Sequence, residues 1–203
     1  MKLAELTNEQ IQNNIESYLD EALGNWMFED YLKQGRRWYD FVNQWCWHVA
    51  HTHDISLHKV AGIVSALSPR NRWDWNLSDA IELIENRDKA KVHTTIVNKK
   101  KALAILEGKD IEATLNGLKT VNFYRCIVNP KDHTSVCVDI WMWRAAFADS
   151  TLKSKSIHPK EYARIQDAVQ AVAAKHTMLP LELQAIVWIV IRDLAQYGQL
   201  RIL

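Results

Sequence analysis

Glycine and proline are scarce in this sequence, and their scarcity limits the folds that the chain can adopt. The 203 residues include six Gly and four Pro. Most of these ten stand between segments whose apolar residues recur every three to four positions, the spacing of amphipathic helices. The one segment with a strand pattern is SVCVD (135–139), which is flanked by helical patterns and has no partner strand. The sequence therefore predicts an all-α fold.

Local signals mark where the predicted helices begin and end. The first has Thr7 with Gln10 three residues later, the pairing of a capping box, and it ends at Gly24. An almost wholly apolar helix over 57–67, capped by Ser56, is expected in the core. Ten helices are expected, at residues 7–24, 36–54, 57–67, 75–86, 97–108, 110–115, 119–128, 139–148, 158–176 and 179–198.

Composition excludes several classes of protein. Apolar residues make up 48% of the chain, which allows a sizeable core and argues against disorder. The formal net charge is +1, so a nucleic-acid contact would come from a local basic patch. Three cysteines are too few for a four-cysteine zinc or iron–sulfur site. We find no signal-peptide pattern and no run of about 18 apolar residues, so we expect a cytoplasmic protein without a membrane partner.

A histidine-rich segment closes the second predicted helix. His48, His51 and His53 are followed by Asp54, and such a group can ligate a metal ion. The segment lacks a His-Glu-x-x-His order and a cysteine partner, and histidine is favoured at helix ends. We therefore predict no metal site and no cofactor.

A lysine and an aspartate begin two successive predicted helices. Lys119 follows a turn at Gly117, and Asp139 follows the apolar run VCV. A lysine can attack a sugar C1′ to form a Schiff base, and a carboxylate can activate water or balance an oxocarbenium-like charge. Two helix N-termini can point at one spot and attract a phosphate. The alternative is structural: an exposed lysine and a helix-capping aspartate.

The segment SPRNRWDWN (68–76) has the composition of a nucleic-acid-binding loop. Arg70 and Arg72 are suited to phosphate contacts, and Trp73 or Trp75 to stacking on a base. The alternative is a loop between helices whose tryptophans are buried in the core.

These segments together resemble the helix–hairpin–helix DNA glycosylases, the superfamily that includes endonuclease III. LNGLKTVNF is similar to their hairpin pattern L-x-G-V-G-x-K-T-A-N, and VCVDIWMWR to their V-D-T-H segment with its later Arg. IVSALSPRNRWDWNLSDA is similar to the helix end that lines their DNA groove, and IVNKKKALAI to the helix before the hairpin. The likeness covers about residues 55–150.

The resemblance implies a single domain over residues 1–203, with about ten helices in two packed lobes and the terminal helices completing the second lobe. It implies a DNA base-acting enzyme, an N-glycosylase or lyase, that flips a base into a cleft between the lobes. Lys119 matches the Schiff-base lysine and Asp139 the catalytic aspartate. The resemblance also implies that DNA contacts are made by Arg70, Arg72, Trp73, Asn76, Gly117, Asn122 and Arg144.

The chain departs from the family in its hairpin, which is shorter by two residues and lacks the second Gly. The four iron–sulfur cysteines are absent, and Ile-Trp follows Asp139 in place of Thr-His. In these points it is similar to a divergent branch, seen largely in phages, that replaces pyrophosphate on a hydroxymethyl-uracil base with an amine. That reaction in a host cytoplasm is one alternative, and a non-catalytic helical DNA- or protein-binding module is another. The sequence leaves the base, the host and the oligomeric state open.

Overall fold

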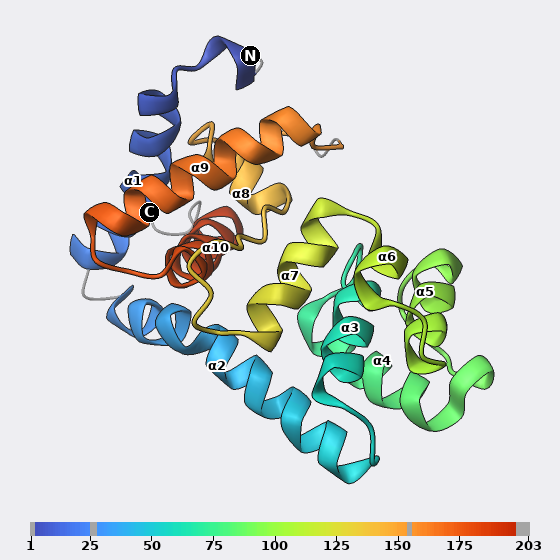
Figure 1. Cartoon of the computed structure of the whole chain (residues 1–203). Coiled ribbons are helices and arrows are strands. Elements are labelled where there is room, and N and C mark those ends of the chain that lie inside the picture. The colour runs from blue at the N-terminus through green and yellow to red at the C-terminus, as the bar shows by residue number, and fades with distance from the viewer. Residues whose placement is uncertain (1–2, 25–27, 154–155, 198–203) are drawn as a thin grey trace. The chain divides into compact units, whose positions relative to one another are not determined.

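The computed structural model describes residues 3–24, 28–153 and 156–197. The fold is 74% helix, and the described residues contain no strand, so the predicted all-α fold is confirmed (Figure 1). No helix in the described ranges is both long enough and apolar enough to cross a bilayer. The ten α-helices found there are α1 (Asn8–Gly24), α2 (Glu29–Thr52), α3 (Leu57–Leu67), α4 (Trp73–Asn86), α5 (Ile96–Leu106), α6 (Ile111–Leu115), α7 (Leu118–Val128), α8 (Ile140–Ala145), α9 (Pro159–Lys175) and α10 (Pro180–Tyr197).

The capping signals in the sequence are realised in the structure. Thr7 N donates to Gln10 Oε1 (2.7 Å) and Gln10 N donates to Thr7 Oγ1 (3.1 Å), which completes the capping box of α1. Ser56 Oγ accepts from Lys59 N (3.2 Å) at the start of α3. Pro159 is the first residue of α9, where its missing N–H costs nothing.

Some boundaries differ from the expectation. The second helix begins at Glu29 rather than at 36, and α4 begins at Trp73 rather than at 75. Residues 135–138 form no strand and make no ladder with another described segment. The expected helix stop at Gly198 lies outside the described residues.

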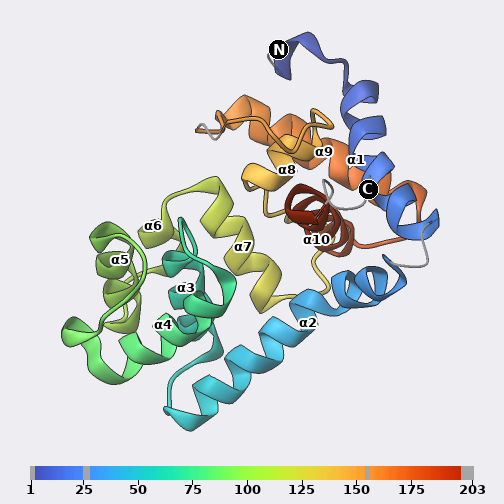
Figure 2. The ribbon, with the colours of Figure 1, turned by 180° about the vertical axis from the view of Figure 1, so that it is seen from behind.

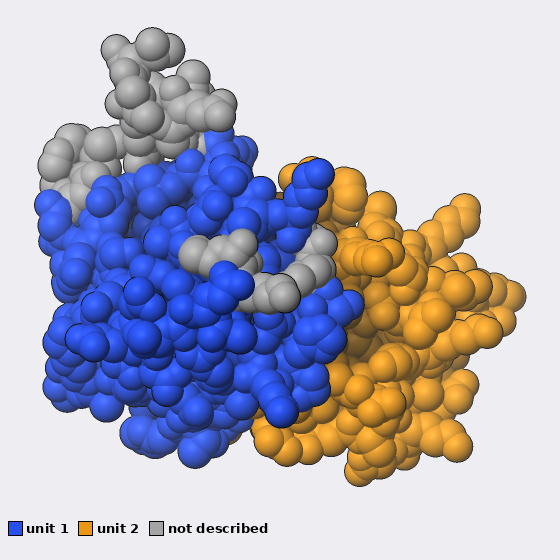
Figure 3. Space-filling view, turned by 90° about the horizontal axis from the view of Figure 1, so that it is seen from above, with its two compact units in different colours: residues 1–39, 131–203 blue, residues 40–130 orange. Residues whose placement is uncertain are grey.

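The chain divides into two compact units, shown in different colours in Figure 3. Unit 1 combines Met1–Tyr39 with Lys131–Leu203, and unit 2 is Asp40–Pro130. The expected core of about 55–150 does not coincide with either unit, since residues 131–150 belong to unit 1. The two units are described separately below.

Unit 1 is built from α1, α8, α9, α10 and the first part of α2. Helices α1, α9 and α10 pack together in the views of Figures 1 and 2. Their apolar faces form one core, to which α1 contributes Ile11, Ile15 and Leu19. Gly35 of α2 lies so close to α10 that a Cβ there would be 2.4 Å from Ile186 Cγ1. Any side chain at position 35 would therefore force the two helices apart.

Unit 2 is organised around α3, which is buried on every side from its second turn onward. Each residue from Val60 to Leu67 is buried, and α4, α5, α6 and α7 all pack against this helix (Figures 1 and 2). A Cβ added at Gly62 would be 2.9 Å from Ile111 Cγ2 and 3.1 Å from Ile105 Cγ2. The absence of a side chain at this position therefore allows α5 and α6 to approach α3 closely.

A charged cluster joins α1 to α9 in unit 1. Glu16 accepts from Lys175 Nζ at 2.9 Å and pairs with His176 Nε2 at 2.5 Å. The hydrogen bond from Lys175, followed by that from His176, lowers the pKa of Glu16. Because the pKa is lower in the folded chain, Glu16 contributes stability above its unfolded pKa. That contribution is lost as the pH falls through the folded value.

We predict that Glu16→Gln lowers the free energy of unfolding at neutral pH by on the order of 1 kcal/mol, because charge-assisted hydrogen bonds are lost. The difference from the wild type should shrink in acidic buffer, as the pH falls through the lowered pKa of Glu16 and the native carboxylate is itself protonated. Urea denaturation at both pH values measures the effect. Asp20→Asn, at an exposed position of α1, is the control and should change stability little at either pH. An equal loss at both pH values would contradict this account.

Candidate functional site

Asp139 is the N-cap residue of α8, at the end of an extended segment. Tyr162 of α9 holds this segment, because its hydroxyl donates to Val136 O (2.7 Å) and accepts from Val138 N (3.2 Å). Asp139 Oδ1 accepts from the backbone N–H groups of the second and third helical residues, at 2.9 and 3.1 Å. Its other oxygen, Oδ2, accepts from Trp188 Nε1 of α10 (3.2 Å). Three N–H donors from two helices therefore orient this partly buried carboxylate.

Trp188, which donates to Asp139, and Trp141, whose backbone N–H also donates to it, each have an arginine stacked on the ring. The Arg192 guanidinium stacks on the Trp188 ring, 4.1 Å from the ring centre. The centres of the Trp188 and Trp38 rings are 6.0 Å apart. Arg144 stacks in the same way on Trp141, at 4.5 Å. A fixed carboxylate can stabilise an electron-poor centre, and arginines stacked on the tryptophans of the same unit can bind anionic groups.

The expected turn at Gly117 lies between two helices of unit 2. Helix α6 ends at Leu115, Asn116 adopts the left-handed conformation (φ 51°), and Gly117 is the N-cap of α7. Lys119 is the second residue of α7 and is partly buried. The predictions that a turn precedes a helix here and that Lys119 begins that helix are confirmed.

Two charged contacts fix this turn. Lys101 Nζ of α5 donates to Leu115 O (2.6 Å), a carbonyl at the end of α6. Arg125 of α7 donates from Nε and Nη2 to the two carboxylate oxygens of Glu112 in α6, at 2.8 and 2.6 Å. This bidentate pair lowers the pKa of Glu112. The positions of Gly117 and Lys119 are therefore set by contacts on both sides of the turn.

Lys119 and Asp139 belong to different units, the lysine to unit 2 and the aspartate to unit 1. Each begins a helix, as the sequence predicts. Their action as a pair stays a prediction.

The loop at 68–72 places charge and aromatic surface together in unit 2. Arg70 is exposed and has a positive φ of 59°. The Arg72 guanidinium stacks on Trp75, 4.8 Å from the ring centre. Trp73 is partly buried and lies against Phe123, with ring centres 6.3 Å apart. The exposed tryptophan of this segment is therefore Trp75, which is 42% exposed.

Two expected DNA contacts lie in the interior instead. Asn76 is 1% exposed and donates to Val64 O (3.1 Å), and Asn122 is 7% exposed and donates to Leu118 O (2.9 Å). Both side chains hydrogen-bond to backbone, so neither presents its amide to a ligand on the surface. The helical spacing of Asn76 with the apolar residues of α4 was the signal that it faces the core.

An Asp–His pair that was not predicted from the sequence lies beside Trp75. Asp79 is 1% exposed, and its Oδ1 lies 2.8 Å from His93 Nδ1. Its Oδ2 accepts from His93 N and from Asn71 Nδ2, both at 2.8 Å. The available signal was an acidic residue on the apolar face of a predicted helix, which requires a partner when buried.

The chain was compared with known protein families, curated proteins and solved structures. The model of a family of unknown function, DUF7178, matches residues 1–195. The chain belongs to the DUF7178 family. No curated protein and no solved structure matches it.

The remaining expected DNA contacts in this DUF7178 protein are Gly117 and Arg144. Gly117 is partly buried, and a Cβ there would be 3.3 Å from Thr120 Oγ1. Arg144 is partly buried and uses Nε to donate to Leu152 O (2.9 Å). Its guanidinium is therefore tied to the loop after α8 through one of its donors.

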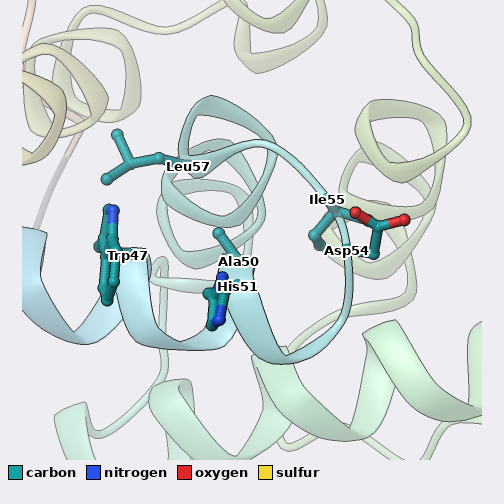
Figure 4. A pocket seen from close by; sticks show the side chains of 6 residues that line it. All are labelled: Trp47, Ala50, His51, Asp54, Ile55 and Leu57. Carbon is teal, nitrogen blue, oxygen red and sulfur yellow. The ribbon is translucent and has the colours of Figure 1, made fainter.

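A surface hollow of about 320 Å³ lies at the end of α2 in unit 2 (Figure 4). Trp47 and His51 line it with parallel rings, 5.5 Å between centres. Asp54, from the histidine-rich segment, also lines it. Among the described residues of this DUF7178 protein, no group of three or more His, Cys, Asp or Glu side chains is arranged to hold a metal ion.

Arg70 yields a prediction that separates stability from binding. Arg70→Gly should raise the free energy of unfolding by up to about 1 kcal/mol, because glycine adopts a positive φ without strain. Arg70→Ala keeps the strain and should leave stability near the wild-type value. If the loop binds DNA, both variants should reduce the salt dependence of duplex binding by about 0.9 in the log–log slope. Urea denaturation and fluorescence anisotropy give the two readouts. Unchanged affinity and slope would mean that the loop does not contact DNA.

Proposed function

We propose that this DUF7178 protein is an enzyme that acts on a DNA base, with a helix–hairpin–helix glycosylase-like fold and Asp139 as its carboxylate. The observation that carries the proposal is the environment of Asp139 in unit 1. Its carboxylate is fixed by two backbone amides and one indole, and the indole itself carries Arg192.

A comparison within the chain distinguishes Asp139 from an ordinary helix cap. Asp110 caps α6 through Oδ1, which accepts from Ala113 N at 2.8 Å, and it is exposed. Asp139 makes the equivalent contacts with Oδ1, but Oδ2 is also held, by Trp188 of a helix distant in sequence. A cap alone requires only the amide contacts. The indole contact fixes the second oxygen as well, as is needed to hold a charge against a reacting atom.

The chemistry proposed is cleavage or substitution at a nucleotide. A carboxylate in this setting stabilises the oxocarbenium-like charge that develops at C1′ when a base leaves, or it orients the attacking group. Arg144 and Arg192, each stacked on a tryptophan, supply positive charge for the phosphates on either side of the target. Lys119, at the start of α7, is proposed as the nucleophile of a lyase step.

We predict that Asp139→Asn reduces turnover by at least about a hundredfold while DNA binding is retained, because the amide keeps an acceptor for the α8 amides but loses the charge. The assay measures base release or base substitution in a duplex oligonucleotide, with binding followed by anisotropy. Asp110→Asn is the matched control, since it makes the same change at a helix cap. Its turnover should equal that of the wild type. Full activity of the Asp139 variant would rule out the enzymatic role.

The lyase step has a separate test. Borohydride should trap a covalent protein–DNA adduct on a lesion-containing duplex if Lys119 forms a Schiff base. Lys119→Ala should abolish the adduct without unfolding the chain, and Lys100→Ala, at an exposed position of α5, should leave it intact. Adduct formation by the Lys119 variant would contradict the assignment.

The same experiments distinguish the alternative functions. An enzyme that replaces pyrophosphate with an amine would act on a duplex carrying pyrophosphorylated hydroxymethyl-uracil, would require Asp139 and would give no trapped adduct. A binding module would bind DNA equally well with either substitution and turn over none of these substrates.

A further inference from the structure

We propose that His93 and Arg72, arranged on Trp75, bind a phosphate group on unit 2, and that this phosphate belongs to the DNA backbone. The assignment of this phosphate to DNA rests on the proposed function. The phosphate site itself rests on the side chains around the buried carboxylate of Asp79.

The burial of Asp79 requires a positive partner. A carboxylate that is 1% exposed would be costly without compensation, and hydrogen bonds with a cation reduce that cost. The described partners of Asp79 are the neutral Asn71 amide, a backbone N–H and the His93 imidazole. Among them only the imidazole can carry a positive charge. The pair is therefore neutral overall when His93 is protonated.

The contact with Asp79 determines what His93 presents to solvent. Nδ1 faces the carboxylate at 2.8 Å, so the opposite nitrogen, Nε2, is on the outer edge of the ring. The His93 side chain is 52% exposed, and no described residue hydrogen-bonds to Nε2. A protonated imidazole has N–H donors on both nitrogens. His93 in this form therefore directs one N–H, at Nε2, towards solvent, and the contact between Nδ1 and Asp79 fixes its direction.

Arg72 provides a second set of donors at the same indole. The His93 ring stacks on Trp75 with centres 4.7 Å apart, and the Arg72 guanidinium stacks on it at 4.8 Å. No hydrogen bond joins this guanidinium to a described side chain or backbone group, so stacking orients it while its N–H groups stay available. Arg72 is also the N-cap residue of α4, and its side chain makes no cap hydrogen bond.

The competing explanation is that the Asp79–His93 pair only holds two loops together. Neutral groups already do this, because Thr94 Oγ1 and Asn98 Nδ2 both donate to Pro69 O, at 2.9 and 3.1 Å. A structural link would need neither an exposed imidazole edge nor a guanidinium stacked on the same indole. The imidazole and the guanidinium each present N–H donors at Trp75, and such donors match the needs of a phosphate.

The test measures binding of a labelled DNA duplex by anisotropy over a range of salt concentrations. His93→Gln retains a donor for Asp79 but loses the charge, and Arg72→Gln changes an exposed side chain. Each should weaken binding several-fold and reduce the log–log salt slope by about 0.9. The matched control is His53→Gln, because His53 also lies near a carboxylate, Glu85 (3.8 Å), elsewhere in unit 2. It should leave affinity and slope unchanged.

A second arm identifies the source of the phosphate. Inorganic phosphate and a deoxynucleoside monophosphate are titrated into the wild type, where the His93 ring and Trp75 indole signals are followed by NMR, and into His93→Gln, where the Trp75 indole signal is followed. Loss of slope with DNA, together with shifts at His93 on adding DNA, supports the proposal. An unchanged slope in a folded His93→Gln protein overturns it. If the wild type binds phosphate but no DNA, the proposed function fails and DNA is not the occupant, whereas the phosphate site stands.

Discussion

Unit 2 depends on the close packing of four helices, α4 to α7, around the buried part of α3 (Val60–Leu67). Its neighbours α5 and α6 approach within contact of Gly62, and a single added Cβ would meet Ile105 and Ile111. This approach positions the end of α6, and with it the turn from which Lys119 follows. It also places the loop after α3, which carries Arg70 and Arg72. The positions of the turn before Lys119 and of the loop with Arg70 and Arg72 therefore both depend on how α3 is packed.

Much of the fold could be predicted from the sequence because it is encoded locally. The cap at Thr7, the stop after Leu67 and the helix starts at Lys119 and Asp139 each depend on residues a few positions apart. The proposed roles of Lys119 and Asp139 came from a resemblance and remain proposals. What could not be predicted is which side chains meet across elements.

Asp139 and Asp79 show where prediction from sequence ends. The cap made by Asp139 follows from its position, but the indole that holds its second oxygen comes from Trp188, 49 residues away. Likewise, nothing near Asp79 in the chain indicates His93 as its partner, because the intervening residues include a helix end and a loop. The resemblance implied that Asn76 and Asn122 contact DNA, yet their helical phase turns both side chains inward. Composition suggests a contact, whereas packing decides whether it is accessible.

The division of the chain into units has a consequence for its synthesis. Unit 2 is one continuous segment, whereas unit 1 is assembled from the two ends of the chain. During translation unit 2 can therefore fold as soon as it leaves the ribosome, while α1 must wait for α9 and α10. Until they emerge, Ile11, Ile15 and Leu19 have no core to enter. The nascent chain thus leaves the apolar face of α1 uncovered through most of its synthesis, and such faces are what molecular chaperones bind.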